Sequence, residues 1–276
     1  MNRLLAANIV RLRKNKCFLG GMLLLVILGI LYPVMKCIEM KNTGYETTLD
    51  TGFFIGAAVL PVLLSVFVSL FIGTEYSDGT IRNKIMVGHE RKSVYLANLL
   101  TNLMAAFALN IVFSSSYLAA GIPLLGFFQE DLKVIFLFAG IEFVLICSFT
   151  ALFTVIAVLI SNKAVSAVIC VLGTFLVLFA ASYLNARLNE PETYPAYTYV
   201  DGRTEVTEEE EKNPLYLDGK DRERYQFLYD FLPGGQVIQC VTMTAVNPKR
   251  LPVYSAILFV LTTAGGVLLF ERKDIK

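Results

Sequence analysis

The sequence predicts an all-α membrane protein with six transmembrane helices, and three observations support that prediction. Hydrophobic residues make up 55% of the chain and charged residues 17%, whereas an average soluble domain is about 25% charged. The mean hydropathy is +0.61. Six stretches each approach or exceed the roughly 20 apolar residues that a helix needs to cross a bilayer. A water-soluble fold of this composition would leave much of its apolar surface exposed.

The six candidate spans are apolar runs, and the third is the most polar of them because it contains Asn102 and Asn110. Pro61 lies inside the second run, where a membrane bundle tolerates proline as a kink. No run has the short apolar core and small-residue cleavage site of a removed signal peptide. We expect the spans at 17–35, 52–73, 96–120, 134–160, 164–184 and 252–270.

The positions of Lys and Arg predict a multi-pass protein of the cell membrane with both termini in the cytoplasm. In that orientation the inner segments contain 13 basic residues, and each of the two short outer loops contains one. The long outer segment holds 8, but long translocated segments carry little weight in this rule. The inner segments are 1–16, 74–95, 161–163 and 271–276, and the short outer loops are 37–51 and 121–133.

The N-terminal segment is basic and has Leu5, Ile9 and Leu12 at helical spacing. This pattern is typical of an interfacial helix that lies on the inner leaflet. It fits the ordinary positive flank of a first span equally well. In the interfacial arrangement, lipid headgroups would be contacted by Arg11, Arg13, Lys14 and Lys16.

An insertion separates the fifth and sixth spans, and we expect it to be a small extracellular α+β unit. Two alternating stretches flank Asp201-Gly202, a pair that favours a two-residue hairpin turn. A charged stretch near 219–231 predicts a helix. The segment 234–247 fits a helix at the outer membrane surface, a shallow re-entrant helix or a flexible loop. The chain then divides into 1–184 with five spans, the insertion 185–251, and 252–276 with the sixth span and tail.

The first inner loop is the most informative segment for function. Ser77 or Asp78 can cap a short helix there, and Ile81 begins an apolar patch. A short helix of this kind suits docking into a groove on another protein. A solvated loop with positive charge accounts for the same residues equally well. The patch also includes Ile85 and Met86, and it is surrounded by Arg82, Lys84, Arg91 and Lys92.

The same loop resembles the signature of ABC-2-type ABC transporter permeases. Three residues separate Glu75 from the run Gly79-Thr80-Ile81-Arg82, and a basic stretch then leads into the next span. The layout of the whole chain is similar too, with a basic N-terminus, six spans and a large segment between the last two. The run Gly88-His89-Glu90 departs from the family, which often has proline and small residues there.

The resemblance implies a permease subunit that works with a separate ATPase. In that family the loop contains the coupling helix, which contacts the ATP-binding subunit, and a second permease chain, identical or related, completes the pathway. ATP and Mg²⁺ would be bound by the ATPase, because this chain has no G-x-x-x-x-G-K-[ST] motif. By the same analogy the substrates are antimicrobial peptides or other amphipathic molecules that are exported. The coupling role would fall on Glu75, Gly79, Thr80, Ile81, Arg82 and Lys84.

One acidic residue lies deep in a predicted span. Glu142 is roughly 12 Å past the outer end of the fourth span by helical rise, where a charge is costly and is usually paired or functional. Asn102 and Asn110 are candidate partners on the third span. Glu142 would serve either the transport pathway or a hydrogen bond between helices.

Other classes of function fit less well. A metal-dependent intramembrane protease needs paired histidine and glutamate, yet the only histidine, His89, lies in an inner loop. No G-x-S-x-G occurs, no residues have metal-ligand spacing, and nothing indicates nucleic-acid binding. The sequence therefore predicts no enzymatic activity in this chain. A non-transporting membrane scaffold or sensor remains an alternative, since bilayer physics alone would produce the same spans.

Overall fold

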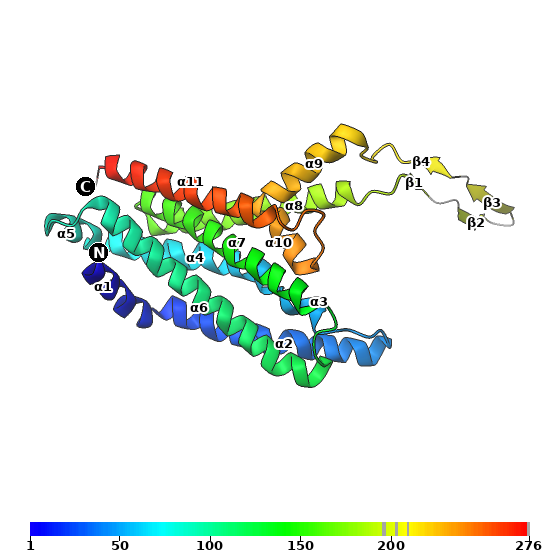
Figure 1. The fold of residues 1–276 in the computed structure, drawn as a ribbon, viewed down its shortest axis with the longest axis horizontal. Coiled ribbons are helices and arrows are strands. Elements are labelled where there is room, and N and C mark those ends of the chain that lie inside the picture. The colour runs from blue at the N-terminus through cyan, green and yellow to red at the C-terminus, as the bar shows by residue number, and fades with distance from the viewer. Residues whose placement is uncertain (195–196, 202–203, 209, 275–276) are drawn as a thin grey trace.

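The computed structural model describes residues 1–194, 197–201, 204–208 and 210–274. Within these residues, 6 helices are long and apolar enough to cross a membrane, so the chain has the architecture of a multi-pass membrane protein. They form one elongated bundle (Figure 1). The six are α2 (Lys16–Thr43), α4 (Gly56–Ser77), α6 (Arg91–Leu125), α7 (Leu132–Leu159), α8 (Lys163–Leu188) and α11 (Leu251–Arg272).

The two ends of the bundle differ in what they carry. Both chain termini lie at one end, together with the short helices α1 (Asn2–Arg13) and α5 (Thr80–Met86) (Figure 1). We call this the terminal end. The other end carries the residues of the predicted insertion, with the short strands projecting beyond the helices (Figure 1). We call it the insertion end.

All six predicted spans are confirmed as helices, and several extend beyond the apolar run. The first span continues as helix α2 to Thr43 and ends at Gly44, whose φ of 74° is in the left-handed region that favours glycine. Helix α4 continues through Pro61, as the membrane setting predicts, and is preceded by the single turn α3 (Asp50–Phe53). Helix α6 begins at Arg91, five residues before the predicted run.

The core of the bundle is formed by α4, α6 and α7. In the most apolar stretch of each helix, 67% of the residues of α7 and 61% of those of α4 are buried. The corresponding shares are only 28% in α2, 22% in α8 and 17% in α11. Helix α2 packs mainly on α6, α11 on α7, and α8 on α4. The large exposed apolar faces of the three peripheral helices fit contact with lipid or with another membrane helix.

The N-terminal segment forms its own helix rather than a simple extension of the first span. Asn15 separates α1 from α2, and its side chain caps α2 by accepting a hydrogen bond from Phe18 N at 2.9 Å. Helix α1 packs on α6 and buries Leu4, Asn8 and Leu12. The buried stripe therefore differs from the predicted one: Leu12 is common to both, but Leu4 and Asn8 are buried in place of Leu5 and Ile9.

The insertion contains both strands and helices, as predicted. Strands β2 (Tyr197–Asp201) and β3 (Thr204–Glu208) pair as an antiparallel hairpin in which Tyr199 lies opposite Val206. Asp201 is the last residue of β2, and the Gly202 half of the predicted turn lies outside the described residues. A second short antiparallel pair joins β1 (Thr193–Tyr194) and β4 (Glu211–Lys212).

Two helices follow the strands, and the second lies among the membrane-spanning helices. Helix α9 (Gly219–Phe231) confirms the predicted helix. Helix α10 (Pro233–Thr242) ends earlier than expected, at Met243 with φ 50°. It packs against α8, α7 and α4 as well as α9. A Cβ on Gly234 would lie 2.4 Å from Val177 O in α8, so α10 can sit this close only with glycine there. The segment 233–242 is therefore a packed helix and not the flexible loop.

Candidate functional site

The strongest polar cluster of the chain lies at the terminal end and is centred on Glu75. Glu75 lies near the end of α4, and its side chain is fully buried, with 0% exposed. An unpaired carboxylate in such a place would be strongly destabilising. The surrounding elements supply the partners that the charge requires.

Two cations and one amide bind the Glu75 carboxylate. Arg11 from α1 and Lys84 from α5 both form ion pairs with Oε1. Asn98 from α6 donates from Nδ2 to Oε2 at 2.8 Å. One carboxylate therefore joins the three consecutive helices α4, α5 and α6 to the N-terminal helix α1.

A second ring of hydrogen bonds closes the cluster. Asn8 donates from Nδ2 to Asn98 Oδ1 at 2.7 Å and accepts from Lys84 Nζ at 3.0 Å. The Arg11 guanidinium donates to Phe71 O at 3.2 Å and lies 3.8 Å from the centre of the Phe71 ring. Burial lowers the pKa of Arg11, and Glu75 acts in the opposite direction. We call Asn8, Arg11, Glu75, Lys84 and Asn98 the Glu75 cluster.

The position of Arg11 corrects the sequence-based expectation. In the interfacial arrangement Arg11 would contact lipid headgroups together with its basic neighbours. Its side chain instead points into the bundle and is only 30% exposed. The ion pair with Glu75 explains this, because the buried carboxylate would be strongly destabilising without a cationic partner. Arg13, Lys14 and Lys16 remain exposed on the same segment.

Helix α5 is the short helix that the loop pattern predicted. Gly79 precedes it as N-cap with φ 66°, a left-handed conformation that other residues adopt at a cost. The side chains of Ser77 and Asp78 make no cap to the helix; they hydrogen-bond to each other instead. Thr80, the first residue of the helix, is half-buried.

The side chains of α5 divide into an inward and an outward set. Lys84 points to Glu75, and Ile81 is only 1% exposed within the hydrophobic core. Ile81 and Lys84 therefore cannot form a free docking surface, contrary to the expectation from the sequence. Because the helix is amphipathic, its opposite side faces outward. That side carries Arg82, Asn83, Met86 and Val87, with Met86 66% and Val87 80% exposed.

The ends of four spanning helices are tied together beside this cluster. Lys273, just after α11, donates from Nζ to Val158 O at 2.8 Å and to Ser161 Oγ at 2.9 Å. The same ammonium donates to Tyr76 OH at 3.0 Å. Arg91, the first residue of α6, donates to Glu271 O at 2.9 Å. The terminal end is thus a connected platform from which α5 projects.

The second candidate site, around Glu142, lies further along the bundle. Glu142 in α7 is 6% exposed, and Asn110 of α6 is a polar neighbour of its carboxyl group. Cys240 of α10 is a further neighbour. Asn102 was the other expected partner, but it donates to Thr154 Oγ1 at 3.0 Å instead. Glu142 therefore lies where α6, α7 and α10 meet.

Sequence reasoning missed two members of the Glu75 cluster, Asn8 and Asn98. A signal for Asn8 was available: it lies four residues from both Leu4 and Leu12, so it is the polar residue on an otherwise apolar stripe. Asn98 is one of several polar residues on α6 and had no comparable signal. Its place opposite Glu75 depends on how α6 packs on α4.

Comparison with known proteins adds no family to this description. No protein-family model matches the sequence, and no curated protein matches it. Among the described residues, no group of histidine, cysteine and acidic side chains could hold a metal ion.

Proposed function

We propose that the chain is the permease subunit of an ATP-driven ABC transporter of the ABC-2 type, driven by a separate ATPase subunit. The observation that carries the proposal is helix α5, which presents an exposed apolar pair, Met86 and Val87, on a platform held by buried ion pairs. Exposed apolar side chains rimmed by polar residues are typical of protein contacts. The resemblance in the loop sequence indicates what kind of partner would cover them.

In this proposal the terminal end is cytoplasmic, because ATP is available there and because the basic residues of the chain concentrate there. The ATPase would cover Arg82, Asn83, Met86 and Val87. Glu75, Gly79 and Lys84 would act as positioning residues that hold α5 in place, without touching the ATPase. ATP and Mg²⁺ would be bound by the ATPase alone.

The transported molecules would be antimicrobial peptides or other amphipathic compounds, moved out of the cell. A second permease chain, identical or related, would complete the pathway. The exposed apolar faces of α2, α8 and α11 offer it ample surface. The insertion, with α10 packed into the end of the bundle, would then lie at the exit side.

The contact with the ATPase is tested by a matched pair of substitutions. Val87→Asp places a charge in the proposed contact, whereas Val246→Asp makes the same change at the insertion end, where Val246 is 72% exposed. Both variants should fold, because both side chains are exposed. We expect Val87→Asp to abolish co-purification of the ATPase and Val246→Asp to preserve it, since a buried unpaired charge costs several kcal/mol.

The same experiment can contradict the proposal. If the complex forms normally with Val87→Asp and with Met86→Asp, the contact lies elsewhere. If no ATPase purifies with the unmodified chain, a membrane scaffold or sensor becomes the better assignment.

A further inference from the structure

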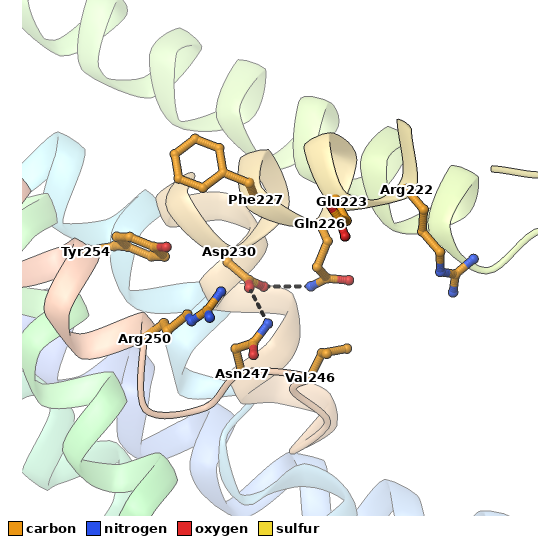
Figure 2. Close-up of a pocket in the computed structure, with 9 residues that line it drawn as sticks. All are labelled: Arg222, Glu223, Gln226, Phe227, Asp230, Val246, Asn247, Arg250 and Tyr254. Atoms are coloured by element: carbon orange, nitrogen blue, oxygen red, sulfur yellow. Dashed lines mark hydrogen bonds between the residues drawn. The ribbon is translucent and has the colours of Figure 1, made fainter. Parts of the chain in front are cut away.

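A polar cavity of about 570 Å³ opens at the insertion end, between α9, the α10–α11 loop and the start of α11. Figure 2 shows Asp230 at its centre, with Arg250 and Tyr254 on one side and Arg222 on the other. None of these residues belongs to the Glu75 cluster or to the surroundings of Glu142. The cavity therefore needs an explanation of its own.

The buried acidic group of the cavity, Asp230, is already stabilised by neutral donors. Asp230 is 2% exposed. Gln226 Nε2 donates to its Oδ1 at 2.7 Å, and Asn247 Nδ2 donates to Oδ2 at 3.3 Å (Figure 2). Gln239 adds a third amide donor at 3.3 Å. With three donors the carboxylate does not require a cation as partner.

The basic groups of the cavity are in the opposite situation. Arg222 and Arg250 are exposed, and within the described part of the chain neither forms an ion pair. Arg250 is also the N-cap of α11, where the helix dipole adds partial positive charge. Lys249 precedes it and is exposed as well. Because the α9 side of the cavity carries the carboxylate of Glu223 beside Arg222, the side that favours an anion is the one with Lys249 and Arg250.

A shallow apolar surface, open to the outside and formed by α11 alone, adjoins the cavity residues Arg250 and Tyr254 in the sequence, and we call it the groove. Its lining is entirely on α11 and includes Ile257 and Leu261. Tyr254, Ile257 and Leu261 follow one another at spacings of three and four residues, so they share one face of the helix. The groove therefore lies directly beside the cavity residue Tyr254. Its lining residues are Pro252, Val253, Ala256, Ile257, Val260 and Leu261.

We propose that this composite site binds an anionic phospholipid from the leaflet at the insertion end. The phosphate lies beside Arg250 and the first turn of α11, and one acyl chain follows the groove toward Leu261. Charge complementarity selects the headgroup, and the apolar lining in a membrane-spanning helix selects the hydrocarbon chain. The proposal is independent of the transport function, because a lipid site requires only the bilayer and the described residues.

Fluorescence quenching by brominated lipids tests the site directly. The chain contains no tryptophan, so Ile257→Trp creates a single reporter in the groove. Tyr183→Trp provides the control on α8, since Tyr183 is 58% exposed and lies five residues from the insertion end of that helix. Each variant is reconstituted in phosphatidylcholine with increasing amounts of brominated phosphatidylglycerol or brominated phosphatidylcholine.

We expect the Ile257→Trp reporter to favour the anionic lipid about fivefold, the effect of one basic residue at a membrane surface. The Tyr183→Trp reporter should show little preference. Adding Arg250→Gln to the Ile257→Trp reporter should remove the preference. Adding Arg224→Gln should not, because Arg224 pairs with Asp221 and lies outside the cavity lining. Equal preference at both reporters, or an unchanged preference with Arg250→Gln, would overturn the proposal.

Discussion

At the scale of single residues, Glu75 has the largest structural consequences. Its fully buried carboxylate holds α1, α5 and α6 against α4 through Arg11, Lys84 and Asn98. Removing one partner of a buried ion pair is strongly destabilising, because the remaining charge stays buried without compensation. Here two cations would lose their partner at once. The cluster is therefore better regarded as the support of α5 than as its contact surface.

Glu75→Gln keeps the size of the side chain and removes its charge. We expect it to lower the stability of the chain by about 3–5 kcal/mol, measured as thermal unfolding of the purified protein in detergent. Asp78→Asn, an exposed neutralisation three residues further on, should change stability by less than about 0.5 kcal/mol. Equal unfolding temperatures for the two variants would show that the ion pairs contribute little.

Only part of this cluster could be predicted from the sequence. The family resemblance singled out Glu75 and Lys84, but it assigned both to the outer contact. Their true direction depends on partners far along the chain: Asn8 and Asn98 are 90 residues apart. Local pattern also placed Ile81 in an exposed patch, because a short amphipathic helix does not reveal which of its faces meets the bundle.

At the scale of elements, the spans were predictable and helix α10 was less so. A membrane span is specified by local composition, since about 20 apolar residues suffice. The extension of α2 to Thr43 and of α6 back to Arg91 lies in polar sequence and depends on neighbouring helices. For α10 the sequence left three alternatives. Packing against α8 excludes the flexible loop.

The close contact of α10 with α8 gives a testable consequence at Gly234. Gly234→Ala would place a methyl group 2.4 Å from Val177 O, so backbone would have to move. We expect a loss of about 1–3 kcal/mol in thermal unfolding. Gly173→Ala in α8, where a Cβ would meet no atom within 4 Å, should be neutral or slightly stabilising. If both substitutions behave alike, α10 does not pack against α8 as described.

At the scale of the whole molecule, the two ends have different chemistry. The terminal end carries the Glu75 cluster and the exposed face of α5, and the insertion end carries the strands, α9 and α10 (Figure 1). The proposed function requires the terminal end to be cytoplasmic, where an ATPase can reach α5. The proposed function therefore depends on the orientation of the chain in the membrane.

Cysteine labelling in intact cells measures this orientation. In a variant without the five native cysteines, Glu210→Cys should react with a membrane-impermeant thiol reagent, because Glu210 is exposed at the insertion end. Glu90→Cys, also exposed but at the terminal end, should react only after the membrane is permeabilised. Labelling of Glu90→Cys in intact cells would reverse the topology and exclude an ATPase contact at α5.

The most direct test of the central claim is a photo-crosslink from α5 in living cells. A photoreactive amino acid at position 87, where Val87 is 80% exposed, should form an adduct with a protein that contains the nucleotide-binding motif G-x-x-x-x-G-K-[ST]. The same amino acid at position 81, where Ile81 is buried within the chain, should give no such adduct. An absent adduct at position 87, or one with a protein that lacks this motif, would contradict the assignment as an ABC transporter permease.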